Sequence, residues 1–233
     1  MMDAHTEMIW QRGSARQIMR EAHKRFQDTL EDSPEAARVA LASAHYSVAK
    51  RYLRFWWQRP LAAWHMLQAA SHAEIVCELR DLGWFKFTAD QVDVIATILS
   101  KVPSWLGGNS ERARRYLEDA LWRHDDEYPM KPHTRALMLI TLGGIESRRV
   151  GVSQAKEYYE RARKLIPEIE TEDSPDRERQ LVRVMAGVAF FEYDHELEKY
   201  FARKMIGRAR DLAEKVSPDQ AEKIRAECLR RGI

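Results

Sequence analysis

Apolar residues recur every three or four positions along most of the chain, and no segment alternates apolar and polar residues as a β-strand does. Prolines, glycines and capping residues fall between these periodic segments and not inside them. Ser33 and Pro34 mark one helix start, and Thr88 marks another. The pattern therefore predicts an all-α protein of nine to ten helices.

Consecutive helical segments are expected to pair into hairpins, because a short break separates each from the next. We predict one helical domain over residues 1–233. Its four hairpins and its C-terminal capping helix cover residues 34–82, 88–124, 135–167, 175–216 and 218–231. The last helix places Ala221, Ile224 and Cys228 on one stripe, as the exposed end of a helical array requires.

Residues 135–167 carry the most specific pattern in the chain. Small residues stand where two helices would approach closely, and large ones where a neighbour would cover them: Leu139, Leu142, Gly143, Ala155, Tyr159 and Ala162, with Pro167 beyond. This stretch resembles a tetratricopeptide repeat, a helix-turn-helix unit that stacks into a right-handed superhelix. Residues 175–216 resemble the repeat more loosely. The first two hairpins match weakly, so another helical-repeat type stays open there.

The resemblance implies a non-catalytic scaffold that binds a peptide or helix of another protein. In the family, the first helices of the hairpins line the binding surface. The inward positions of the third hairpin would be Ile140 and Gly144, which cannot hold a carboxylate, and Arg148 would lie at the edge. Ile140 and Phe191 would form an apolar groove for an amphipathic helix. The alternative, favoured by burial preferences, is that both pack inside the fold.

Two adjacent tryptophans and their arginines form the most unusual segment: Arg54, Trp56, Trp57 and Arg59. On a helix, adjacent side chains point about 100° apart, so both rings cannot share one narrow core stripe. Such a patch suits a protein partner first, and a membrane interface or unpaired bases after that. The alternative, again favoured by burial preferences, is a helix end in which the arginines and Trp64 cover the rings.

The overall charge is nearly balanced, with 38 Lys and Arg against 36 Asp and Glu. Neither half is strongly basic, which argues against a dedicated nucleic-acid binder. The excess of Arg over Lys indicates either ion pairs between helices or a codon bias. Self-assembly through the aromatic patch, and binding of nucleic acid by Arg-rich helices, remain the alternatives to a protein partner.

No residue set predicts catalysis, a cofactor or a metal site. Glu192 and His195 give one Glu-x-x-His spacing where a di-iron site needs two, and we expect them in a solvated turn. His65 and His72 lie two helical turns apart with Glu74 nearby. They are too far apart to share one ion unless a third element folds in.

The cysteine content favours a reducing, cytoplasmic location. Cys77 and Cys228 show no metal-ligand spacing, and both fit apolar helical patterns as small core residues. No stretch has the roughly 18 uncharged apolar residues that a membrane-spanning helix needs. We therefore expect neither a transmembrane segment nor a peripheral membrane attachment.

Overall fold

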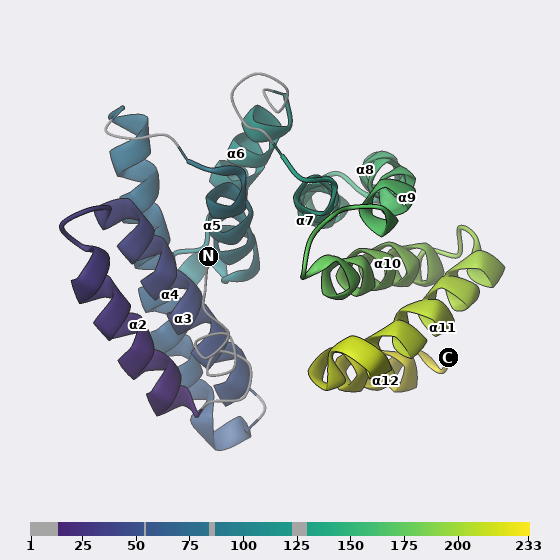
Figure 1. Cartoon of the computed structure of the whole chain (residues 1–233), viewed down its shortest axis with the longest axis horizontal. Coiled ribbons are helices and arrows are strands. Elements are labelled where there is room, and N and C mark those ends of the chain that lie inside the picture. Colours follow the sequence, from purple (N-terminus) through teal and green to yellow (C-terminus); the bar gives the residue numbers. More distant parts are fainter. Residues whose placement is uncertain (1–13, 54, 84–86, 123–129) are drawn as a thin grey trace. The chain divides into compact units, whose positions relative to one another are not determined.

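The computed structural model describes residues 14–53, 55–83, 87–122 and 130–233, and every regular element in this part of the chain is helical (Figure 1). Its ten longer helices are α2 (Ala15–Thr29), α3 (Pro34–Tyr52), α4 (Arg59–Asp81), α5 (Ala89–Lys101), α6 (Ser110–Trp122), α7 (Pro132–Arg149), α8 (Val152–Lys164), α10 (Arg177–Asp194), α11 (Lys199–Val216) and α12 (Pro218–Arg231). Three short elements join them: η1 (Trp56–Gln58), η2 (Ser104–Leu106) and α9 (Ile166–Glu170). The predicted all-α class is confirmed.

The predicted helix start at Thr88 is confirmed by its capping geometry, and Pro34 begins α3 as expected, although the Ser33 side chain makes no capping hydrogen bond. The Ser14 hydroxyl accepts a hydrogen bond from the Gln17 backbone N–H at 3.2 Å, and the Gln17 side chain accepts one from Ser14 at 2.7 Å. Thr88 and Gln91 form the same reciprocal arrangement before α5. Each pair satisfies two N–H groups that the first helical turn leaves without partners. These side chains thus fix where α2 and α5 begin.

The chain divides into two compact units, Met1–Ala120 and Leu121–Ile233. We call them unit 1 and unit 2 and describe each by itself. The predicted single array over residues 1–233 stays a prediction. None of the helices in the described ranges combines the length and the apolar character needed to cross a membrane.

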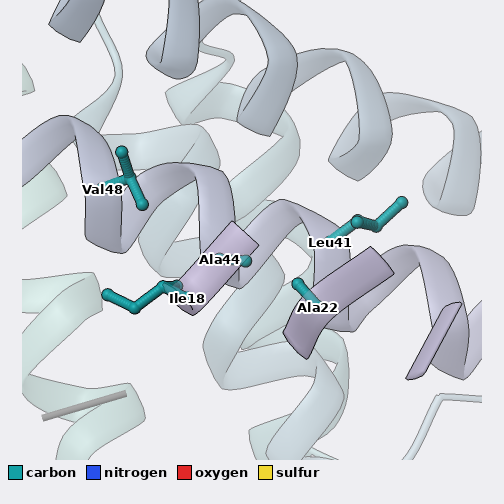
Figure 2. Close-up of a cluster of buried hydrophobic side chains, with 5 residues drawn as sticks. All are labelled: Ile18, Ala22, Leu41, Ala44 and Val48. Atoms are coloured by element: carbon teal, nitrogen blue, oxygen red, sulfur yellow. The ribbon is translucent and has the colours of Figure 1, made fainter. Parts of the chain in front are cut away.

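In unit 1, α2 packs along α3 through small and branched side chains. Figure 2 shows the cluster that joins them: Ile18 and Ala22 from α2 and Leu41, Ala44 and Val48 from α3. All five are at most 4% exposed. Because alanines occupy the middle of this contact, the two helices can approach closely and exclude water.

Ion pairs and hydrogen bonds join α4 to α6 in the same unit. The Arg80 guanidinium contacts Asp119 at 2.7 Å, and the Arg112 guanidinium contacts Asp81 at 3.1 Å. The Tyr116 hydroxyl donates to the same Asp81 carboxylate at 2.7 Å. For these arginines, the predicted pairing with carboxylates between helices is therefore confirmed.

In unit 2, α7 and α8 meet at the residues that the sequence pattern singled out. Leu139, Leu142, Gly143, Ala155, Tyr159 and Ala162 are all buried. Gly143 lies so close to α8 that a Cβ atom there would be 2.7 Å from the Tyr159 ring. The predicted close approach of two helices at this glycine is thus present, although it does not by itself establish a superhelical repeat.

Replacing Gly143 by alanine is expected to destabilise unit 2 by about 1 kcal/mol. Its new methyl group would overlap the buried Tyr159 ring, and such overpacking typically costs about 1–3 kcal/mol. The higher helix propensity of alanine offsets about 1 kcal/mol of this cost. Gly144→Ala is the matched control, because its Cβ would meet nothing closer than 3.7 Å and should stabilise the helix slightly. Urea unfolding followed by far-UV circular dichroism compares the two, and equal midpoints would contradict the close contact.

The C-terminal helix α12 closes the other end of unit 2. Ala221, Ile224 and Cys228 are buried, as predicted for a capping helix. The Arg231 guanidinium donates hydrogen bonds to both carboxylate oxygens of Asp194, at 2.6 and 2.8 Å. This two-point contact fixes the end of α12 to the end of α10, because the planar guanidinium matches the carboxylate geometry.

Candidate functional site

Six large apolar side chains are exposed together where α3 leads into α4 in unit 1: Leu53, Phe55, Trp56, Trp57, Leu61 and Trp64. We call them the aromatic surface. Trp56 is 74% exposed and Trp57 60% exposed. The Trp57 ring contacts those of Phe55 and Trp56, with centroids 5.3 and 6.0 Å apart. Burial of the tryptophans, which the residue preferences favoured, is therefore wrong for both rings.

The helical placement of the two tryptophans is also corrected. Helix α3 ends at Tyr52, and Trp56 and Trp57 lie in the 3-10 turn η1. The Phe55 N–H donates to the Tyr52 carbonyl at 3.1 Å, and the Gln58 N–H donates to the Phe55 carbonyl at 3.0 Å. Pro60 then stands in the first turn of α4, where its missing N–H costs no helical hydrogen bond. The connection is therefore compact and presents its bulky side chains outward.

The large rings lie outside because small residues fill the faces of α3 and α4. The buried residues of these helices are mostly alanines, including Ala37, Ala44, Ala62, Ala69 and Ala73. Helices that pack through alanines leave no room for an indole ring between them. Because monomeric proteins rarely expose so many large apolar side chains in one short segment without a use, the aromatic surface is the leading candidate site.

Two buried histidines lie directly beneath this surface. The Nδ1 atoms of His45 and His65 are 2.9 Å apart, a distance at which one ring donates and the other accepts. Trp64 packs edge-on against His65, with ring centroids 4.7 Å apart, and the Tyr52 ring also contacts His65, with centroids 5.5 Å apart. Burial, reinforced by the neighbouring histidines, lowers the pKa of His45 to about 3. The pair is therefore neutral at physiological pH and holds Trp64 in place.

His72 belongs to the same cluster but does not complete a metal site. Its ring centroid is 5.8 Å from that of His45, so α3 does supply the third element that the spacing of His65 and His72 requires. Glu74, however, pairs with Arg112 of α6. Among the described residues, no three His, Cys, Asp or Glu side chains converge in a way that could hold a metal ion. The cluster is better described as a buried polar network.

The aromatic surface lies in a segment with a strong charge bias. Residues 36–73 contain no Asp or Glu, but they contain five basic residues: Arg38, Lys50, Arg51, Arg54 and Arg59. Arg59 is exposed at the first residue of α4, and Lys50 is exposed in the last turn of α3. Arg54 lies outside the described residues. The balanced charge of the whole chain hid this bias, and a count in a window of about one hairpin reveals it.

The predicted groove residues lie in unit 2 and pack within it. Phe191 is buried and stacks on Tyr159, with ring centroids 3.8 Å apart. Ile140 is half-buried, and its side chain lies against Gly187 of α10. Arg148 is exposed near the end of α7. Packing therefore accounts for the apolar character of Phe191 and Ile140, and a role in binding a partner stays a prediction for all three residues.

Glu192 and His195 differ from the expected solvated turn residues. Glu192 is only 5% exposed, and its Oε1 accepts a hydrogen bond from Arg163 of α8 at 3.1 Å. Burial raises the pKa of this carboxyl, and Arg163 opposes the shift. His195 lies half-buried against Phe191. Glu192 thus links α10 to α8, which the sequence spacing did not reveal because the arginine partner is distant along the chain.

A concave region lies on unit 2, with a volume of about 720 Å³. Its charged lining residues have both signs: Glu170, Arg177, Glu178, Lys204, Arg208, Asp211 and Lys215. Arg208 is already paired with Glu170 at 2.7 Å. Because opposite charges alternate there, the region favours no class of ligand, and it is the weaker candidate.

The arginine runs that suggested nucleic-acid binding are largely paired with carboxylates. Arg114 contacts Glu111 at 2.7 Å and Glu118 at 2.6 Å on α6. Arg112 bridges to α4, as described above. Arginines neutralised in this way offer little charge to a phosphate backbone.

Comparison of the chain with protein-family models, with curated proteins and with solved structures gives no match.

Proposed function

We propose that this protein is a non-catalytic, tetratricopeptide-like helical scaffold that binds another protein through the aromatic surface. The observation that carries the proposal is the joint exposure of Trp56, Trp57 and Trp64 beside Arg59. Tryptophan and arginine are the residues most often found at the energetic centres of protein interfaces. The hairpin α3–α4 supplies a rigid platform, since its alanine-lined faces pack closely beneath the rings.

Self-association through the same surface is the less favourable alternative. In a symmetric dimer, the aromatic surface of one copy would face that of the other. The exposed Arg59 of one copy would then lie close to the aromatic surface and Arg59 of the other, in a segment that contains no Asp or Glu. Like charges across an interface are costly, so we expect a monomer near 27.3 kDa in light scattering at all concentrations.

Replacing Trp56 and Trp57 together by alanine is expected to weaken partner binding by about 30-fold or more. An aromatic anchor at the centre of an interface contributes about 2 kcal/mol or more, and about 1.4 kcal/mol corresponds to a tenfold change in affinity. Because both rings are exposed, the free energy of unfolding should change by less than about 0.5 kcal/mol. The measurement is quantitative affinity capture from an extract of the native host.

Trp122→Ala is the matched control, because Trp122 is 89% exposed and lies outside the aromatic surface. It should leave the captured proteins unchanged. If the double variant captured the same proteins in the same amounts as the wild type, the aromatic surface would not be the binding site.

A further inference from the structure

A small cavity in unit 2 contains a buried carboxylate oxygen that has no hydrogen-bond donor. The cavity has a volume of about 50 Å³ and lies between α8, the end of α10 and the connection to α11. Glu192 of α10 lines it and is only 5% exposed. Its Oε1 accepts the hydrogen bond from Arg163, but its buried Oε2 accepts none from the described part of the chain. Because a buried acceptor without a donor is costly, this oxygen favours a ligand that can donate a hydrogen bond.

The charged side chains around the cavity leave one negative charge uncompensated. The Nη1 atom of Arg163 donates to both Glu192 and Glu198, at 3.1 and 2.9 Å. Lys156 pairs with Glu160 at 3.5 Å, so these two residues compensate each other. One guanidinium therefore serves two carboxylates, and the lining has three acidic side chains against two basic ones. A ligand with a single positive charge would neutralise the cavity.

The apolar walls of the cavity limit the size of that ligand. Tyr159 and Phe191 are both buried and their rings stack, with centroids 3.8 Å apart and planes inclined by 8°. Leu197 adds a further apolar side chain to the lining. A water molecule occupies about 30 Å³ in the liquid, so the cavity holds about two groups of that size. An ammonium group and the methylene beside it fit this space, whereas a guanidinium group with its stem is larger.

A metal ion and a water molecule each suit the cavity less well than an ammonium group. Among the described residues, no three His, Cys, Asp or Glu side chains converge in a way that could hold a metal ion. A water molecule would donate to Oε2 of Glu192 but would leave the negative charge uncompensated. A primary ammonium group supplies both the donor and the charge, and a hydrogen bond between two charged groups is among the strongest in proteins.

We propose that this cavity binds a primary ammonium group, which donates a hydrogen bond to Oε2 of Glu192. The rings of Tyr159 and Phe191 cover the methylene next to the nitrogen. A lysine side chain of another protein and a small alkylamine both present this group, and the contact with Glu192 is the same for either. The cavity shares no residue with the aromatic surface, so either site can exist without the other.

The test is an NMR titration of the full-length protein with ethylammonium chloride. The methyl signals of Leu197 should shift and reach saturation, because this side chain lines the cavity. Potassium chloride at the same ionic strength should not shift them, since K⁺ donates no hydrogen bond. Tetramethylammonium carries the charge without an N–H group and should bind at least about tenfold more weakly. The peptide acetyl-Gly-Lys-Gly-amide separates the two sources: tighter binding than ethylammonium assigns the site to lysine side chains, and weaker binding assigns it to small amines.

Three variants make the test specific. Glu192→Gln keeps the size of the side chain and an acceptor for Arg163, and it should weaken ethylammonium binding by about tenfold or more because the charge is lost. Glu198→Gln should weaken binding by a smaller factor, since Glu198 is exposed to solvent. Glu157→Gln is the matched control, because Glu157 is exposed on α8 and does not line the cavity, so the affinity should stay unchanged.

The absence of a saturable shift at Leu197 would overturn the inference, because water alone would then fill the cavity. Equal affinity for ethylammonium, K⁺ and tetramethylammonium would overturn it as well, since the site would recognise charge without the N–H donor. Unchanged ethylammonium affinity in folded Glu192→Gln would exclude Glu192 as the acceptor. If that variant did not fold, the comparison of cations on the wild-type protein would still decide the question.

Discussion

Between pH 6.5 and about pH 4.5, unit 1 is expected to lose about 2 kcal/mol or more of its free energy of unfolding. The cause is the buried histidine pair beneath the aromatic surface. The pKa of His45 is lowered from 6.5 to about 3 in the folded protein, first by burial and then by the neighbouring His65, His72 and His23. The unfolded chain therefore takes up a proton at a pH where the folded chain does not.

The direction of this effect follows from proton linkage. Above pH 6.5 both states are neutral at His45, so its stability contribution does not change with pH. As the pH falls below 6.5, protonation favours the unfolded state by up to about 1.4 kcal/mol per pH unit, and the loss ends near pH 3. Burial lowers the pKa of His65 and His72 as well, which adds to the loss. Exposed glutamates begin to titrate toward the lower end of this window, so the contribution of the histidines is read as the difference between the wild type and a variant that lacks His45.

Tryptophan fluorescence reports this loss selectively, since six of the seven tryptophans belong to unit 1. As the pH is lowered from 6.5 to about 4.5, the urea midpoint of the wild type should decrease. The midpoint of His45→Leu should decrease less steeply, because this variant lacks the histidine whose pKa is lowered most strongly. His195→Gln is the control, because His195 lies in unit 2 and does not belong to the histidine cluster, so the slope should stay nearly unchanged. A pH-independent midpoint in the wild type would show that the histidines are not buried as a neutral pair.

Gly108→Ala is expected to destabilise unit 1 by about 3 kcal/mol. A Cβ atom at this position would lie 1.8 Å from the Val102 carbonyl oxygen and 3.1 Å from that of Pro103. The backbone cannot retreat without cost, because the Gly108 N–H donates to Pro103 and the Asn109 N–H donates to Leu99. Overpacking usually costs about 1–3 kcal/mol, and contact with fixed backbone atoms belongs at the upper end.

Gly207→Ala provides the matched control for this substitution. Gly207 lies inside α11, and an added Cβ would meet no atom within 4 Å. Removing the flexibility of a mid-helix glycine should stabilise the protein by up to about 1 kcal/mol. Relative to the wild type, the urea midpoint should therefore decrease in Gly108→Ala and increase in Gly207→Ala. A Gly108→Ala midpoint equal to that of the wild type would contradict the tight turn before α6.

Helix positions were predictable where local chemistry sets them. Ser14 and Thr88 use their hydroxyls as caps, and the helix after Ser217 begins at Pro218 as expected. The end of α3 was not predictable, because the residues after Tyr52 are compatible with a helix. Local propensity therefore does not reveal where α3 stops.

The candidate site was only partly predictable for the same reason. The composition around Trp56 and Trp57 singled out the segment, but average burial preferences favoured covered rings. Their exposure depends on the alanine-lined contact between α3 and α4. The sequence spacing of His65 and His72 likewise said nothing of His45, which reaches them from another helix. The segment between residues 36 and 73 shows its charge bias directly, once acidic residues are counted locally.

Site-specific photo-crosslinking tests most directly whether the aromatic surface binds a partner protein. A benzophenone amino acid replaces Trp57 in one variant and Trp122 in another, and both variants are irradiated in the native host. We predict a discrete crosslinked protein at position 57, with no such product at position 122. No product at position 57, or the same products at both positions, would contradict a binding role for this surface.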